Sequence, residues 1–451
     1  MPSPRVPRRA SAALAACLAL ATSAAAQPSR LALVGGTLID GYGGAPLANS
    51  VILIEGERIT AVGQVGQLAV PATHRVISTE GMSVLPGLWE MHAHLMLAGH
   101  GNYPHWDALY PPLLERTIIP ATAKQLLMAG VTSVRDLGAP LEPIMAVKRQ
   151  IDSGALLGAT IYPSGPFIQH AAYPGTGYFR WGVNGAADAR AKVKRLAEAG
   201  VTVIKLIDQD EMTMEEVRAV VDEAHAHRLP VVAHAHRPEE VRRGLAAGVD
   251  DFEHTGMATA NEYPADVIDL LKARTAQGAK GPLFWTPTID ILYHYQDRAA
   301  HPEFLDDPAW HAGLPDSVVR DIRASLARLD TLTYYRAMPY RKHTLQRKFQ
   351  QLREAGVQLL IGTDAGVPAA FHSGITWQEM RTWVRDLGMD PMLTIRAATF
   401  WPAVAMGVER EVGTVTVGKV ADIIAVRGNV LDDIALLRDV PLVIKRGARV
   451  K

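Results

Sequence analysis

VKRLAEAGVTVIKLID, residues 193–208, passes from helical periodicity through Ala-Gly-Val into a short apolar strand. The same pattern recurs at residues 123–138, 241–256 and 349–364. The glycine after each helical part, Gly200 in the first, suits a position where the backbone needs a positive φ angle. The β-branched run that follows suits a strand buried on both faces. Helix, break and strand repeated in this way predict a parallel sheet surrounded by helices.

Further strands complete the pattern. Residues 214–236 repeat it with Leu-Pro as the break, and the segments ATIYPSG and FWTPTID read as two more strands. The predicted strands end near His94, Asp136, Gly165, Lys205, His236, His254, Thr288 and Asp364. Eight parallel strands predict an α/β fold, a (β/α)8 TIM-like barrel over residues 86–407, with a doubly wound open sheet as the alternative. Residues 260–350 exceed one strand–helix unit and are expected to hold an excursion that could cover a site.

The two ends of the chain have a different pattern. LALVGGTLIDG and VILIEGERITAVG near the start, and GTVTVGKVADIIAVRG and LVIKRGARVK near the end, are short strands around glycine-containing turns. We expect residues 27–85 and 408–451 to form one small β-sandwich domain built from both termini. Residues 27–85 and 408–451 would then flank the barrel without belonging to it.

The first 26 residues have a basic start, a short Ala/Leu run and small residues before Gln27. This is the pattern of a signal peptide cleaved after Ala26, and it predicts an exported protein, periplasmic or secreted. Arg8-Arg9 and Cys17 leave a twin-arginine or a lipoprotein route open beside the general secretory one. The apolar run is too short and too rich in alanine for an integral membrane span.

Charge and cysteine content narrow the chemistry. The 46 basic and 46 acidic side chains balance, which gives no indication of a nucleic-acid partner. Cys17 is the only cysteine, so the mature chain would have no disulfide, thiolate ligand or cysteine nucleophile. Any metal must therefore be bound through nitrogen and oxygen. Nothing in the sequence decides whether the protein forms a homo-oligomer.

Metal-binding side chain types gather at the predicted strand ends, where barrel enzymes carry their chemistry. His92 and His94 are two residues apart on a strand, so their imidazoles point to the same side and could hold one ion. Alone, each such residue is more often an ordinary polar side chain, but their joint placement at the strand ends predicts a metal site. The other members are Lys205, His234, His236, His254 and Asp364.

These segments resemble the metal-dependent amidohydrolase superfamily. The resemblance rests on VLPGLWEMHAHL, VIKLI, VVAHAH, DFEHTG, IGTDAGV and the tail ATFWPAVAMGVEREVGTVTVGKVADIIAV, and it covers nearly all of the mature chain. The chain is most similar to the branch of imidazolonepropionase-like amidohydrolases and Xaa-Pro dipeptidases. It departs from the family at Glu90, where an aspartate usually precedes the first histidine.

The resemblance implies a pair of divalent metal ions, with zinc as the default and manganese, nickel or iron as alternatives. It assigns His92, His94 and Asp364 to the first ion. His234 and His254 would hold the second ion, with His236 as the alternative to His234 or as a substrate contact. Lys205, carboxylated by CO2, would bridge both ions, and Asp364 would also carry the proton from the attacking water to the leaving amine.

The substrate is expected to be a small molecule or short peptide, a Xaa-Pro-like dipeptide or an N-acyl amino acid. The loop at residues 167–182 offers four candidate contacts: His170, Tyr173, Tyr178 and Arg180. Arg180 could pair with a carboxylate, and Tyr293 and His294 are further candidates. Two alternatives remain: a deaminase or cyclic amide or imide hydrolase, against which Lys205 counts, and a scaffold that binds without catalysis.

Overall fold

The computed structural model describes residue 1 and residues 30–255, 260–278 and 281–451. The predicted signal peptide, with Arg8, Arg9 and Cys17, lies outside these residues apart from Met1. Across the described ranges, no helix has the length and apolar character that a membrane crossing requires.

Parallel strands form the centre of an α/β fold, as predicted. The described residues contain a seven-stranded and a three-stranded parallel sheet. In spatial order the larger sheet comprises β11 (Arg180–Gly182), β10 (Phe167–Gln169), β12 (Ile204–Leu206), β13 (Val231–His234), β14 (Asp251–Glu253), β15 (Phe284–Thr286) and β16 (Gln358–Leu359). The smaller comprises β7 (Leu88–Ala93), β8 (Val131–Asp136) and β9 (Thr160–Pro163). Every residue of β7 and β8 is buried, as expected for strands covered on both faces.

Backbone hydrogen bonds join the two sheets. Beyond β16, the carbonyl of Ile361 accepts from the amide of Met91 in β7 at 3.0 Å, and Ala365 accepts from His94 at 2.8 Å. On the other side, the carbonyl of Pro163 in β9 accepts from the amide of Thr202, just before β12, at 2.9 Å. All eight predicted strands are present, and these bonds place their carboxyl ends together.

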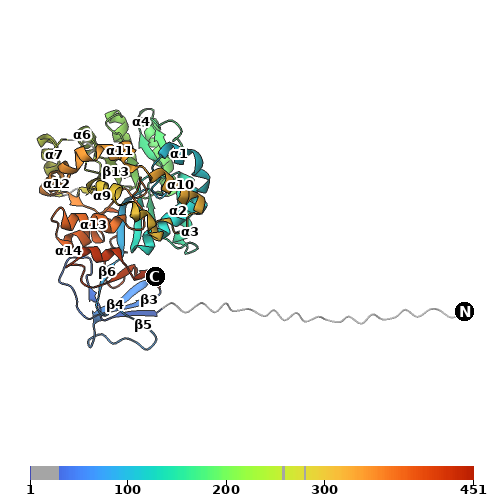
Figure 1. Ribbon diagram of the computed structural model, residues 1–451, viewed down its shortest axis with the longest axis vertical. Helices are drawn as coiled ribbons and strands as arrows, with labels where there is room; N and C mark the ends of the chain where they lie inside the picture. The colour runs from blue at the N-terminus through green and yellow to red at the C-terminus, as the bar shows by residue number, and fades with distance from the viewer. Residues whose placement is uncertain (2–29, 256–259, 279–280) are drawn as a thin grey trace.

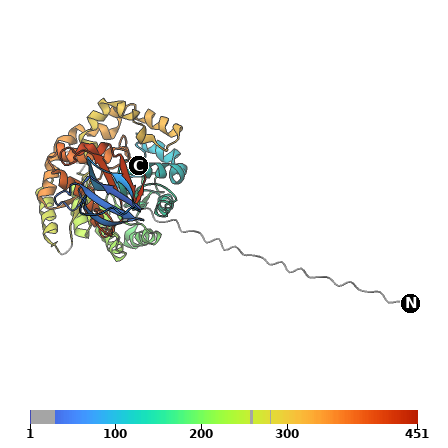
Figure 2. The ribbon, with the colours of Figure 1, turned by 90° about the horizontal axis from the view of Figure 1, so that it is seen from below.

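Helices form a ring around the molecule, which Figure 2 shows from below with the blue N-terminal strands in front. They are α2 (Ile119–Met128), α3 (Leu141–Asp152), α4 (Gly185–Ala199), α5 (Met214–Ala226), α6 (Pro238–Ala247), α7 (Ala265–Ala276), α12 (Pro339–Glu354), α13 (Ile375–Arg385), α14 (Pro391–Ala397) and α15 (Phe400–Ala405). The four repeated glycines have φ angles of +90°, +86°, +95° and +77° at Gly130, Gly200, Gly248 and Gly356. A residue with a Cβ would be strained there, which explains the repeated Ala-Gly-Val.

The predicted excursion between β15 and β16 is helical. It contains α8 (Asp290–Tyr293), α9 (Tyr295–Ala300), α10 (Asp316–Leu326) and α11 (Thr333–Ala337) before α12. The amide of Gly101, just ahead of α1 (Tyr103–Leu109), donates to Ser325 Oγ in α10 at 2.9 Å. The excursion therefore packs against the segment that leads into α1.

Strands from the two ends of the chain form two further sheets, which lie together below the helices (Figure 1). One has the order β4 (Arg58–Gln64), β3 (Ser50–Glu55), β1 (Arg30–Val34) and β5 (Arg75–Ser78). The other has the order β19 (Ala448–Arg449), β18 (Leu442–Lys445), β17 (Ile423–Arg427), β6 (Met82–Pro86) and β2 (Thr37–Leu38). β17 is antiparallel to β6, so residues from both termini share one sheet. An apolar cluster that includes Leu33, Ile52 and Ile444 fills the space between the sheets.

Candidate metal centre

The first cluster of the site joins the end of β7 to the residues that follow β16. The Nε2 atoms of His92 and His94 lie 3.5 Å and 3.0 Å from Asp364 Oδ1. One potential ligand atom from each of the three residues lies within 4.8 Å of the others. Burial raises the pKa of Asp364, but His92 and the hydrogen bond from His94 outweigh it and lower the pKa to about 2. Asp364 is therefore an anion at neutral pH.

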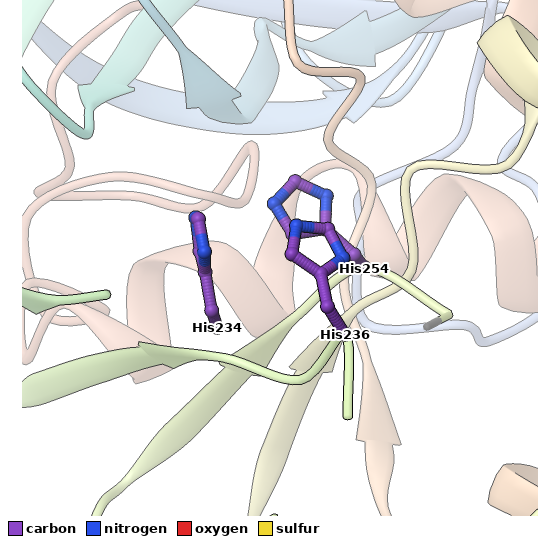
Figure 3. A group of neighbouring side chains, drawn as sticks. All are labelled: His234, His236 and His254. Carbon is purple, nitrogen blue, oxygen red and sulfur yellow. The ribbon is translucent and has the colours of Figure 1, made fainter. Parts of the chain in front are cut away.

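The second cluster consists of His234, His236 and His254, whose side chains extend to the same side of the sheet (Figure 3). The rings of His236 and His254 are stacked with their centroids 4.3 Å apart, and His234 lies 4.7 Å from His236. The two clusters adjoin, because the ring centroids of His92 and His254 are 4.7 Å apart. They therefore form one site.

Lys205 lies in β12 and is fully buried. Burial lowers the pKa of its amine to about 8. Its charge contributes to the lowered pKa values of His92 and His234, one residue from each cluster, and of Asp364.

The site leaves several buried polar atoms unpaired. Within the described part of the chain, His92 Nε2, His234 Nδ1, His236 Nδ1 and Lys205 Nζ have no hydrogen-bond partner. An unsatisfied buried polar group costs about 1–3 kcal/mol, so such a concentration indicates a missing partner. Burial holds the pKa of His92, His234 and His254 well below the ordinary value, so these imidazoles are neutral. Neutral imidazole is the form that binds metal ions.

The backbone is strained at two of these residues. The φ angles of His254 and Asp364 are +74° and +61°, and Thr288 at the end of the next strand has +47°. Side chains with a Cβ rarely adopt this region, and such strain persists mostly at functional sites. The hydroxyl of Thr288 lies 2.8 Å from His254 Nδ1 and fixes the orientation of that ring.

A buried network of ion pairs contacts the first cluster through His92. His92 Nδ1 lies 2.5 Å from Glu253 Oε2, and Arg135 donates to Glu253 Oε1 at 2.6 Å and to Asp251 Oδ2 at 2.6 Å. Glu253 therefore accepts from both His92 and Arg135, which turns the free Nε2 edge of His92 toward Asp364. Reasoning from the sequence missed this network, although charged residues in strands buried on both faces were a signal for it.

Replacing Arg135 with alanine should lower the free energy of unfolding by about 3–5 kcal/mol, because it leaves two buried carboxylates without their cation. Chemical denaturation measures this loss. The matched control is Arg328→Ala, in an ion pair with Asp330 whose side chains are 72% and 65% exposed; its unfolding midpoint should stay unchanged. An Arg135→Ala midpoint equal to that of the control would contradict the role of the network.

Glu90, two residues before His92, is buried and does not belong to either cluster. Its Oε1 accepts from the amides of His92 at 3.0 Å and Thr363 at 2.8 Å. Its Oε2 accepts from the hydroxyls of Thr363 and Thr376 at 2.9 and 2.7 Å. Glu90 thereby holds the backbones before His92 and Asp364 together, and no ligand is lost.

The clusters open into a cavity of about 610 Å³. One part of its wall is His94, His234, His236, His254 and Asp364, and another includes Tyr103, Asp107, Phe167, Tyr173, Phe179 and Arg180. Arg180 lies over the ring of Tyr173 at 4.4 Å and donates to Gln169 Oε1 at 3.1 Å. Its buried Nε atom has no hydrogen-bond partner among the described residues.

The other predicted substrate contacts are placed differently. Tyr178 donates to Asp107 at 2.8 Å and thus positions a residue of the cavity wall. His170 is exposed and is not part of the wall. His294, with Tyr293 beside it, does not join the site: it lines another cavity and contacts Asp297 at 2.8 Å and Asp386 at 3.1 Å. Its expected contact with the same substrate is therefore not supported, because those carboxylates occupy its ring nitrogens.

Comparison with known proteins agrees with this architecture. The model of the amidohydrolase family matches residues 83–450. Ochratoxinase from Aspergillus niger is 25% identical over 90% of this chain and 83% of its own. A solved Xaa-Pro dipeptidase with methionine bound in its active site is 25% identical, covers 94% of this chain and 100% of its own, and has a TM-score of 0.71. A solved prolidase complexed with N-methylphosphonate-L-proline is also 25% identical with the same coverage and a TM-score of 0.72.

Proposed function

Because the chain belongs to the amidohydrolase family and is a hydrolase acting on C–N bonds, we propose that it cleaves the amide of a Xaa-Pro-like dipeptide or an N-acyl amino acid. One observation carries this proposal: the cavity that holds both histidine clusters also holds Arg180, whose guanidinium has a buried, unpaired Nε. Such a guanidinium suits the carboxylate that follows the scissile amide in both substrate classes. The similarity to a Xaa-Pro dipeptidase and a prolidase also supports a dipeptide substrate.

The proposal includes the finer architecture of the fold. We infer that β7, β8, β9, β12, β13, β14, β15 and β16 form one closed barrel, with β10 and β11 added outside it. The support comes from the hydrogen bonds from Met91 to Ile361 and from Thr202 to Pro163, which continue the pairing on both sides. We propose residues 86–407 as the barrel domain and residues 27–85 with 408–451 as the small β domain.

Two divalent cations, with zinc as the first choice, fit the unpaired imidazole nitrogens of the two clusters. His92, His94 and Asp364 would hold one ion, and His234 and His254 the other. His234 is preferred over His236 because it ends β13, directly after the apolar residues of that strand. His236 then faces the cavity, where it contacts substrate.

Lys205 is proposed to carry a carbamate whose oxygens would be available as metal ligands. Its unprotonated amine would form a bond to the carbon of CO2 as one C–O π bond breaks, and the proton lost from nitrogen would pass to water, leaving an anionic carbamate. The buried Nζ supports this assignment, because among the described residues it has no hydrogen-bond partner. A deaminase site typically uses one metal ion and gives this lysine no such role, so Lys205 counts against that alternative. Hydrolysis of a cyclic amide or imide on the same scaffold is the other alternative.

The ions, when bound, would polarise the amide carbonyl and lower the pKa of a bound water. Asp364 is an anion beside His94, so it can accept a proton as water attacks the amide carbon and pass that proton to the leaving nitrogen. Arg180 holds the carboxylate of the leaving part, and its contacts with Tyr173 and Gln169 keep the guanidinium in place. Phe167 and Phe179 exclude water around it.

We also propose that the protein is exported. Residues 1–26 would direct the protein to the periplasm or the medium, where hydrolysis of dipeptides or N-acyl amino acids would serve scavenging. N-terminal sequencing of the protein from its natural host tests it, and a mature chain that begins at Gln27 is expected.

Arg180→Ala should raise the KM for a Xaa-Pro dipeptide roughly 10- to 100-fold, since a hydrogen bond to a charged group contributes about 1.5–3 kcal/mol. Steady-state kinetics should be measured for the wild type and the variant with two substrates, the dipeptide and an analogue in which a carboxamide replaces the carboxylate. The wild type should turn over the carboxamide analogue poorly. Arg180→Ala should change the KM for that analogue little. An equal effect on both substrates would show that Arg180 does not bind the carboxylate. Arg190→Ala, on the exposed side of α4, serves as the control.

A further inference from the structure

A second group of metal-binding side chains lies outside the site described above. His100, His105 and Asp321 each offer a ligand atom, and these atoms lie within 4.8 Å of one another. Asp321 Oδ2 lies 2.8 Å from His105 Nε2 and 3.4 Å from His100 Nε2. The two imidazole rings are nearly parallel, at 9°, with their centroids 5.3 Å apart. Both rings thus present the Nε2 edge to the same carboxylate.

His100 is the informative member of this group. Its side chain is 3% exposed, and its buried Nε2 has no hydrogen-bond partner among the described residues. Its Nδ1 lies 2.9 Å from the amide nitrogen and 3.0 Å from the carbonyl oxygen of Asn102. With the proton on Nε2, Nδ1 accepts from the amide of Asn102, but the buried Nε2–H has no acceptor in hydrogen-bonding geometry among the described residues. With the proton on Nδ1, the ring gives up that bond, donates to the carbonyl of Asn102 instead and presents a free lone pair at Nε2, which is the form that binds a metal ion.

The carboxylate of Asp321 also has a hydrogen-bond partner that fixes its orientation. Tyr110 donates to Asp321 Oδ2 at 2.5 Å. His105 Nε2 lies 2.8 Å from the same Asp321 oxygen. Metal ligands typically have such outer partners, a carbonyl for the histidine and a donor for the carboxylate.

We propose that His100, His105 and Asp321 bind a further divalent cation of the zinc type, separate from the catalytic pair. Two imidazoles and one carboxylate are ligands that suit zinc, and water can complete a tetrahedral site from the exposed side. That side is open, because the side chains of His105 and Asp321 are 40% and 30% exposed. The ligand set is built from elements far apart in the chain, since Asp321 belongs to α10 and the histidines flank the start of α1.

The proposed cation site lies between α10 of the excursion and α1. A cation bound there fixes α10 of the excursion to α1, where Gly101 and Ser325 already form a hydrogen bond. Tyr103 and Asp107 of α1 are part of the wall of the catalytic cavity. The cation therefore stiffens one wall of the substrate pocket from outside.

The test is the number of zinc ions per chain after equilibrium dialysis against buffered zinc. His105→Ala, at a partly exposed position, should bind one equivalent fewer than the wild type. His301→Ala should bind as many as the wild type, because His301 is 69% exposed, pairs with Glu303 at 2.9 Å and belongs to no metal-binding group among the described residues. The comparison between variants does not depend on how many ions the catalytic clusters hold, so failure of the proposed function would not affect it.

A second variant keeps all three ligands. Tyr110→Phe removes only the hydrogen bond to Asp321 and should weaken zinc binding at this site roughly tenfold, the usual effect of losing an outer partner. Zinc should also raise the melting temperature of the wild type more than that of His105→Ala. Equal zinc content and equal zinc-dependent stabilisation in the wild type and His105→Ala would overturn the proposal.

Discussion

Lys205→Ala is expected to lose at least one equivalent of bound metal and to reduce kcat/KM for a Xaa-Pro dipeptide by at least roughly 100-fold. Removing an outer partner of a metal site already costs about 10- to 100-fold, and Lys205 is proposed to reach the ions themselves. The charge of Lys205 contributes to the lowered pKa of His92 in one cluster and of His234 in the other, so its loss should affect both. Elemental analysis and steady-state kinetics on the same preparation measure the two effects.

The control for this substitution is Lys348→Met. Lys348 is also buried, and burial also lowers its pKa to about 8, but it lies in α12 and donates to Thr344. Its replacement should leave the metal content unchanged, even if it changes stability. Lys205→Ala protein with full metal content and full activity would rule out the carbamate.

Asp364→Asn should reduce kcat by roughly 10²- to 10⁴-fold, the usual contribution of a general acid or base. An amide cannot accept the proton of the attacking water, and it is also a weaker ligand beside His92 and His94. The KM should change much less, because the substrate carboxylate is held by Arg180 at another part of the wall. Steady-state kinetics at saturating metal separate the two parameters.

Asp386→Asn is the matched control, since Asp386 contacts His294 in a different cavity. It should retain the wild-type kcat. If Asp364→Asn also retained kcat within tenfold, Asp364 could not be the residue that transfers the proton.

Local rules explain how much of this molecule could be predicted from its sequence. The positive φ angles at Gly130, Gly200, Gly248 and Gly356 follow from the break between each helix and strand. The convergence of His92 with His94 follows from the two-residue period of a strand. Because parallel strands place their carboxyl ends together, the remaining members of the clusters could be predicted without knowing any distance.

Features that depend on contacts between distant segments could not be predicted. His294 was expected near the substrate because it follows β15, but its ring is occupied by Asp297 and Asp386. His92, Glu253 and Arg135 lie on three different strands, so no local sequence pattern predicts the hydrogen bonds from His92 and Arg135 to Glu253. The same holds for the further cation site, in which Asp321 is more than 200 positions along the chain from His100 and His105.

The most direct test of the central claim, two ions held by two adjoining clusters, is anomalous diffraction at the zinc absorption edge from crystals grown with zinc and bicarbonate. One strong peak is predicted among His92, His94 and Asp364, and a second between His234 and His254, with density for a carbamate on Lys205 reaching both. Zinc-loaded crystals without a peak at either cluster, or with Lys205 unmodified and distant from both peaks, would contradict the account.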